Sequence, residues 1–471
     1  MPNNRNLSRR AIFRFVVMGA IVLSSLGQGI SIAIAENENH GSPHLKIVTF
    51  KVDVTPSIGE QLAYVINEKV ETPIFVSGIV LDDGRTRAVW VSCDYLYLCG
   101  DIHVHWTDEI ARQAETAREN VFLHSIHQHD TLWMAPGYNP KEGENGRMIV
   151  NPEYCEKSLK NVLEGIGKAV SGPWQTVGKL LTSETRVGGL AASRRIRDEN
   201  GVMRPRLSGV NPPDVQALTV GIIDPILRTV CFENTEGRRI VALHFYATHP
   251  QSAYMRGMVS TDVPGRALRH VQENDQSVAL NIYFSGCGAD VAFGKYNLTG
   301  DINTIERLGK RLGDGILRNL QRLEEQPIGS LVVKRVAFEV PFLASIPPAS
   351  ECPGLRAPER RYLLETMDRW RKSTVARMSI GPRTHFLSFE PGEVFVDYQL
   401  YAQSLIPEHF LATAAFGNGV YLYIPTRAAI EENAGYETGP GECLVTPEID
   451  ETLRNAIRQC FDEVINGPDV F

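Results

Sequence analysis

Residues 121–138 read VFLHSIHQHDTLWMAPGY. At the start of this stretch, five apolar or small residues surround His124, a pattern that favours a short β-strand. His127 and His129 then arrive where this strand would end. If the segment stays extended, their side chains point to the same side, because strand side chains alternate. From this stretch alone, packing, a metal site and acid–base chemistry all remain open.

Strand-like and helix-like segments alternate on both sides of this stretch. The pattern predicts strands at 87–96, 238–248 and 278–286, helices at 105–120 and 302–325, strand–turn–helix at 383–406, and strand–turn–strand at 410–426. This alternation predicts the α/β fold class, with mixed β-sheets layered with helices. Because functional groups in open α/β folds gather where strands end, we expect a site at the strand ends.

The first 35 residues have the composition of an export signal. A basic segment with four arginines and no acidic residue precedes an apolar run that ends in Ala33-Ile34-Ala35. This predicts a secretory signal peptide over residues 1–35, cleaved after Ala35, and a secreted or periplasmic protein. Ser8-Arg9-Arg10 fits either a twin-arginine signal or an ordinary basic region. No later apolar run reaches the ~20 residues that span a bilayer, so we expect no transmembrane segment.

Charge and cysteine content narrow the class of protein. The 471-residue chain has a formal net charge of −7, which argues against nucleic-acid binding. Its length suits one large catalytic domain or two tightly packed ones. Eight cysteines occur without a C-x-x-C pair, so disulfides and buried free thiols are both open.

Other metal-ligand side chains follow predicted strands. His249 follows the strand at 238–248, Glu393 follows the strand that ends in FEPG, and Tyr423 lies in NGVYLYIPT. Together with His127 they offer two imidazoles, a carboxylate and a phenol, a ligand set that suits zinc with one position open for water. A single histidine after a strand is more often a packed residue, and no local signature unites this set.

Six short motifs resemble the neutral/alkaline (non-lysosomal) ceramidase family, in the family's order. They are FKVDVTPSIG (50–59), SIHQH (125–129), FYATHPQS with VSTDVPG (245–265), SGCGADV (285–291), EPGE (390–393), and GNGVYLYIPT with GYETG (417–439). Each motif is short and weak by itself, but the six follow one another in the family's order over about four-fifths of the chain. The resemblance implies a catalytic domain over residues 36–471, without the C-terminal sandwich-like domain of full-length ceramidases.

The resemblance also implies roles for the site residues. His127, His249, Glu393 and Tyr423 would bind one Zn²⁺ per chain. His129 would sit beside the metal and act on the scissile amide, Arg194 would face the substrate carbonyl, and Tyr436 would line the pocket. Arg195 competes with Arg194 for its assignment. Asp94 and Asp262 are the carboxylates expected to orient the ligating imidazoles, or else ordinary strand-end or turn residues.

The expected activity is hydrolysis of an amide (N-acyl) bond by a metal-activated water. The substrate would be ceramide-like or another N-acylated lipid or sugar, and a lipid substrate allows transient contact with a membrane surface. Glu393 or His129 would carry the proton. The alternative is a catalytically silent binding protein on the same scaffold.

Two departures from the family's pattern motivate this alternative. Ala292 stands where the family has a serine with an active-site role. The pocket wall after His129 is expected to carry Asp130, Leu132 and Trp133 in place of small residues. We expect these changes to shift the substrate away from ceramide.

Overall fold

The computed structural model describes residues 44–135, 151–298, 301–346, 348, 350, 364–365 and 367–467. The predicted signal peptide, residues 1–35, lies outside these ranges. No helix in the described ranges combines the length and apolarity needed to cross a lipid bilayer.

The largest sheet has nine strands, which come from residues 46–326. Its order is β15-β13-β12-β8-β1-β3-β4-β6, and β17 pairs with β8 off this path. The strands are β1 (Lys46–Asp53), β3 (Phe75–Asp82), β4 (Arg87–Cys93), β6 (Val121–Ser125), β8 (Gln175–Arg186), β12 (Ile226–Asn234), β13 (Arg239–Tyr246), β15 (Val278–Ser285) and β17 (Glu324–Gln326). Most pairs are antiparallel, but β4–β6 and β13–β15 are parallel, so the sheet is mixed as predicted.

A second sheet packs against this one. It has the order β18-β19-β20-β22 and comprises Leu331–Glu339, Lys372–Ile380, Thr384–Phe389 and Phe410–Ala414. The core between the sheets contains Trp90 of β4, whose ring stacks on Phe122 with centroids 4.6 Å apart. The same indole lies 5.3 Å from the ring of Phe386 on β20, and all three side chains are buried. Large aromatic groups of this kind contribute much of the apolar burial that holds two sheets together.

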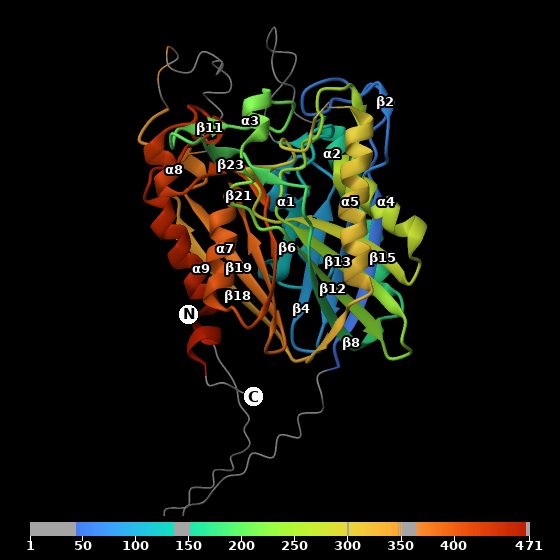
Figure 1. Ribbon diagram of the computed structural model, residues 1–471. Helices are drawn as coiled ribbons and strands as arrows, with labels where there is room; N and C mark the ends of the chain where they lie inside the picture. The colour runs from blue at the N-terminus through green and yellow to red at the C-terminus, as the bar shows by residue number, and fades with distance from the viewer. Residues whose placement is uncertain are drawn as a thin grey trace, which may run out of the picture. The chain divides into compact units, whose positions relative to one another are not determined.

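Helices cover the outer faces of both sheets (Figure 1). The nine-stranded sheet is covered by α1 (Gly100–Gln113) and α2 (Pro152–Ser171) at one part, and by α4 (Asp262–Asn274) and α5 (Ile302–Leu320) at another. The four-stranded sheet is covered by α7 (Val396–Leu405) and α9 (Ile449–Asn466). The layers therefore run helix, sheet, sheet, helix, which confirms the predicted α/β class.

Short elements connect these layers near the strand ends. They are β2 (Lys69–Val70), β5 (Tyr97–Leu98), η1 (Arg118–Asn120), β7 (Trp133–Met134), β9 (Ala192–Ser193), β10 (Arg195–Arg197), β11 (Met203–Pro205), α3 (Pro213–Ala217), β14 (Met258–Val259), β16 (Val291–Ala292), β21 (Pro391–Val394), β23 (Asn418–Ile424), α8 (Arg427–Glu432) and η3 (Tyr436–Thr438). Strands β21, β23, β5 and β7 form a small sheet of their own.

Some of the predicted boundaries differ from the structure. The helix expected at 105–120 is α1, which ends at Gln113 because Glu115 adopts a left-handed conformation (φ 55°) that cannot continue a helix. The helix expected at 302–325 ends at Leu320, and Glu324–Gln326 pairs with β8 instead. The predicted Pro-Gly turn near residue 391 is strand β21, which pairs in parallel with β23.

The cysteine alternatives are also settled for most of the chain. The seven cysteines in the described ranges are free and buried, whereas Cys352 lies outside those ranges. Buried free thiols are therefore the correct alternative for these seven.

Candidate metal centre and active site

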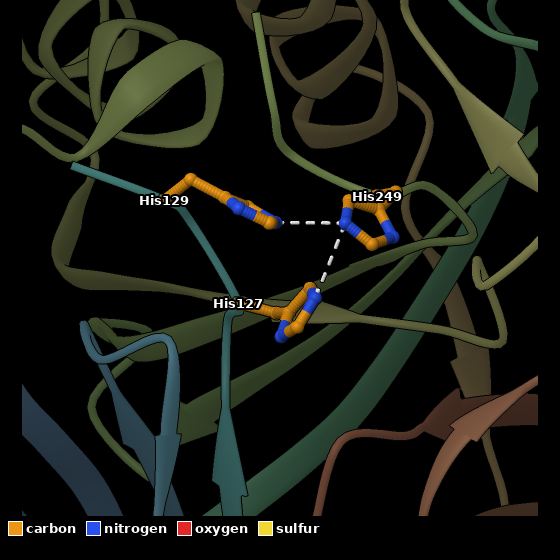
Figure 2. Close-up of side chains that lie close together, drawn as sticks. All are labelled: His127, His129 and His249. Atoms are coloured by element: carbon orange, nitrogen blue, oxygen red, sulfur yellow. Dashed lines mark hydrogen bonds between the residues drawn. The ribbon is translucent and has the colours of Figure 1, made fainter. Parts of the chain in front are cut away.

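Three imidazoles converge at the ends of two strands. His127 and His129 follow β6, and His249 follows β13. The Nε2 atom of His249 lies 3.2 Å from Nε2 of His127 and 2.8 Å from Nε2 of His129. Figure 2 shows how the three rings point toward one another. All three residues are buried, and one nitrogen from each lies within 4.8 Å of the others. This group could hold a metal ion.

His127 is held in a conformation that a strand could not give it. Its backbone N–H donates to the Tyr95 carbonyl (3.1 Å), and its φ of 69° is left-handed. The expectation of a continuous extended segment is therefore wrong, although both imidazoles still reach the same place. Such strained conformations in residues other than glycine gather at functional sites. The ring stacks on Phe416 with centroids 4.3 Å apart.

The second nitrogen of the His127 ring fixes its tautomer. Nδ1 lies 2.9 Å from the Leu96 carbonyl, an acceptor, so Nδ1 carries the proton. Nε2 is then left with a lone pair that faces His249. A backbone carbonyl thus orients this imidazole, a role often filled by a partner beyond the metal ligands.

Two side chains hold the other ring nitrogen of His129. Its Nδ1 lies 3.0 Å from the Tyr64 hydroxyl and 3.2 Å from the Gln251 side-chain amide nitrogen. Its Nε2 is closer to His249 (2.8 Å) than that of His127 is (3.2 Å), so the structure brings His129 into the cluster together with the predicted ligands.

Glu393 and Tyr423 reach the cluster from two paired strands. They are direct partners in the β21–β23 register. The Oε2 atom of Glu393 lies 3.7 Å from His127 Nε2 and 3.5 Å from His249 Nδ1. Its Oε1 accepts a hydrogen bond from the Tyr97 hydroxyl.

Two buried atoms between Glu393 and His249 have no hydrogen-bond partner. They are Nδ1 of His249 and Oε2 of Glu393, which face each other. A buried polar atom without a partner costs free energy, so such atoms commonly mark a functional site or a bound ion. All four predicted ligands therefore lie together, with unsatisfied donor atoms among them.

Burial keeps the imidazoles neutral. It lowers the pKa of His127 to about 3 and the pKa values of His129 and His249 well below the ordinary value. Burial also raises the pKa of Glu393 to about 7, against hydrogen bonds from Tyr97 and Tyr423 that lower it. Neutral imidazoles beside a carboxylate and a phenol fit a divalent metal such as zinc.

Arg194 brings the positive charge next to this cluster. Its Nη1 donates to the Tyr423 hydroxyl and to the Ala289 carbonyl, both at 3.2 Å, and its Nε lies 2.8 Å from Glu437 Oε1. Burial would lower the pKa of Arg194, but Tyr423 and Glu437 raise it above the ordinary value. The competing residue, Arg195, pairs instead with Glu432 at 2.9 Å.

Three tyrosine side chains lie next to the cluster. Tyr436 is 46% exposed, its ring lies 5.8 Å from that of Tyr423, and its hydroxyl donates to Glu442. Tyr64 and Tyr254 lie 5.9 and 6.2 Å from the His129 ring, and Tyr254 is also 46% exposed. We call Tyr64, Tyr254 and Tyr436 the aromatic rim.

The three residues expected in the wall after His129 have partners of their own. Asp130 is buried in an ion pair with Arg256 at 2.6 Å, because a buried carboxylate needs a charged partner. Leu132 is fully buried in the core beneath α1 and α2. The indole N–H of Trp133 donates to Cys99 Sγ.

Asp94 and Asp262 do not orient the imidazoles. The hydrogen bonds of their carboxylates go to backbone N–H groups, at Phe75 for Asp94 and at Ser252, Ala253 and Val263 for Asp262. Ala292 forms a backbone bridge with His249 and is fully buried, so it supports this segment through its main chain.

Sequence reasoning missed several neighbours of the cluster. They are Tyr64, Tyr97, Gln251, Tyr254 and Glu437. Glu437 and Gln251 lie inside the motifs GYETG and FYATHPQS, so their place in those motifs was a usable signal. Tyr64 and Tyr97 come from segments that gave no such signal.

Known proteins match this chain only through their structures. No protein-family model and no curated protein matches the sequence. The neutral ceramidase from Pseudomonas aeruginosa is similar with a TM-score of 0.66 and 14% identity, over 90% of this chain and 74% of that chain. A ceramidase complexed with C2 is similar with a TM-score of 0.64 and 14% identity, over 90% of this chain and 75% of that chain. The resemblance predicted from the motifs is confirmed at the level of the fold: this chain has the fold of the neutral ceramidases.

Proposed function

We propose that this protein is an exported, zinc-dependent amidohydrolase that cleaves the N-acyl bond of an acylated lipid or sugar. The observation that carries the proposal is the buried group of neutral imidazoles beside Glu393 and Arg194, on a fold shared with proteins named as ceramidases. Export is proposed from the signal-like composition of residues 1–35.

His127, His249, Glu393 and Tyr423 would hold one Zn²⁺ per chain. When bound, this ion would supply Lewis acidity and a water nucleophile active near neutral pH. The orphaned Glu393 Oε2 and His249 Nδ1 support a ligand at this point, because each needs a partner.

Arg194 would oppose the charge that develops on the carbonyl oxygen of the amide. Its guanidinium is fixed from two sides by Glu437 and the Ala289 carbonyl, so it need not reorganise during the reaction. A fixed donor at a developing oxyanion is worth roughly 3–4 kcal/mol of barrier.

His129 would carry the proton to the leaving amine. Tyr64 and Gln251 hold its Nδ1, which leaves Nε2 directed at the cluster. Hydrolysis adds one water across the C–N bond, so the acyl group leaves as a carboxylate and the nitrogen leaves as an amine that must gain a proton.

The aromatic rim would receive the substrate. The exposed rings of Tyr254 and Tyr436 offer apolar faces and polar edges, which suits an acyl chain or a sugar ring next to the amide. Tyr436 would contribute most directly, because its ring lies beside both Tyr423 and Arg194.

The test compares three histidine variants for zinc content and turnover on a panel of N-acyl lipids, N-acetyl sugars and simple esters. His127→Ala should lose zinc and activity. His129→Ala should keep zinc and lower kcat by ~10²–10⁴-fold, the usual worth of a positioned acid or base. His105→Ala is the matched control, because His105 is an exposed histidine on α1.

Each contrary result has a defined meaning. Zinc loss in His129→Ala makes His129 a joint ligand, as the close packing of the three imidazoles allows. Protein that binds no zinc, and whose activity is unaffected by chelators, contradicts the proposal. Tight binding of panel compounds without turnover favours the silent binding protein.

A further inference from the structure

One cleft lies between strands β1, β3, β4 and β15 and helix α4, apart from the cluster of His127, His129 and His249. Its volume is about 440 Å³, within the ~300–1,000 Å³ range of small-molecule sites. Its wall is largely apolar, with Phe75, Ile126, Leu268, Leu280 and Ile282 among the residues that line it. None of the proposed zinc ligands lines this cleft.

Asp94 is the acidic group at this wall that has no cationic partner. One carboxylate oxygen accepts a hydrogen bond from the Phe75 N–H at 2.8 Å, and that is the only side-chain bond of Asp94 to the described residues. The nearby Lys51 ammonium lies over the Phe75 ring, 4.0 Å from its centroid, and forms no ion pair with Asp94. Burial raises the pKa of Asp94 to about 7, against the Phe75 N–H and the Lys51 charge, which lower it.

Several other polar groups around the cleft already have partners, although the buried Nδ2 atom of Asn281 has none. Ser92 donates to the Tyr283 carbonyl at 2.6 Å, and the hydroxyls of Thr72 and Thr261 bond to each other at 2.9 Å. Arg269, which also lines the cleft, pairs with Glu306 at 2.5 Å. Asp94 therefore offers a carboxylate oxygen that a ligand could use.

The cleft and the cluster of three imidazoles share one chain segment. The main-chain carbonyl of Asp94 accepts hydrogen bonds from Gln128 at 2.5 Å and Thr131 at 2.9 Å, on either side of His129. Ile126, in the wall, directly precedes His127. A molecule in the cleft would lie against the segment that carries two of the three imidazoles.

We propose that this cleft binds an amphipathic amine, with its ammonium group on Asp94 and its apolar body against Ile126, Leu280 and Ile282. An ammonium group has three donors and no acceptor, which matches an unpaired carboxylate. Hydrogen bonds between charged partners are about twice as strong as neutral ones. The proposal does not rest on the proposed function, because it concerns binding and needs no turnover.

The test measures binding of hexylamine and hexanol to the full chain by calorimetry. The two probes have the same apolar chain and differ in the charged head group. Hexylamine should bind wild-type protein more tightly than hexanol. Asp94→Asn should weaken hexylamine ~10–100-fold, as expected for losing a charged hydrogen bond, and leave hexanol unchanged. Asparagine is nearly isosteric and keeps an acceptor for the Phe75 N–H, so this variant should fold.

Two further variants test the location. Lys51→Gln should strengthen hexylamine binding, because it removes a positive charge that lies near Asp94 and would repel the ammonium group of the probe. Leu268→Trp should weaken both probes by filling the cleft from α4, with folding checked by circular dichroism. The proposal is overturned if hexylamine shows no saturable binding, or if Asp94→Asn binds it within twofold of wild type.

Discussion

The buried ion pair between Arg194 and Glu437 gives the sharpest stability prediction. Arg194 is 4% exposed and Glu437 is 1% exposed, and the ion-paired atoms lie 2.8 Å apart. Glu437 also lies 3.6 Å from Arg195 through its other oxygen. Glu437→Gln keeps the size of the side chain and removes its charge, which leaves the Arg194 guanidinium buried beside a neutral group.

The expected loss in the free energy of unfolding depends on the hydrogen bonds that Arg194 keeps. Breaking a buried pair by removing one partner costs about 3–5 kcal/mol. Arg194 keeps its bonds to the Ala289 carbonyl and the Tyr423 hydroxyl, and glutamine keeps an acceptor, so we expect the lower end, about 3 kcal/mol. Adding Arg194→Met to this variant removes the stranded charge, so the double variant should be more stable than Glu437→Gln alone, by roughly 1–2 kcal/mol.

The assay is urea unfolding of the four proteins in the cycle, with zinc removed so that metal affinity does not enter. Glu432→Gln is the matched control, because Glu432 pairs with Arg195 and Arg197 nearer the surface, where an ion pair is worth at most about 1 kcal/mol. A loss below about 1 kcal/mol in Glu437→Gln, or a double variant less stable than both single variants, would refute the reasoning.

Three more predictions concern the metal and pH. Gly288→Ala should lower zinc content, because an added Cβ would lie 2.4 Å from the Thr248 backbone and displace His249, whereas Gly188→Ala has nothing within 4 Å and should bind zinc normally. Chelation should lower the Tm of wild type more than that of His127→Ala, since a ligand at ~1,000 times its Kd stabilises by about 4 kcal/mol; equal shifts would place zinc elsewhere. Although burial would raise the pKa of Glu71, hydrogen bonds from Arg256 and Ser260 lower it to about 2. Its stabilisation is therefore present above its unfolded pKa and lost as the pH falls from about 5 to about 2, roughly 1–2 kcal/mol after screening. Urea unfolding across this range should show a smaller loss for Glu71→Gln, and identical pH dependence would contradict the assignment.

Features that depend on local pattern could be predicted from the sequence. The long helix α5 buries Ile305, Leu308 and Leu312 on one face, as the spacing indicated. The strand before His127 and the strand before His249 end within two residues of the predicted ends. Period and composition are properties of neighbouring residues, so one sequence carries them.

Features that depend on distant partners could not be predicted in the same way. The partner of Asp130 is Arg256, more than a hundred residues away, and without it the carboxylate appeared to face the pocket. Asp94 shows the same limit. Its position after a strand indicated a role at the metal, but its carboxylate bonds to Phe75 on the neighbouring strand and lines a different cleft.

The histidine pair shows why a correct location can follow from an incorrect geometry. The extended segment assumed for residues 127–129 would have placed both imidazoles on one face of a strand. Instead the chain turns at His127 into a left-handed conformation, with its N–H held by the Tyr95 carbonyl and its ring packed on Phe416. Because these supports come from other segments, the orientation of His127 depends on the assembled fold rather than on strand alternation. Substitution at Phe416 should therefore disturb the proposed metal centre even though its side chain offers no ligand atom.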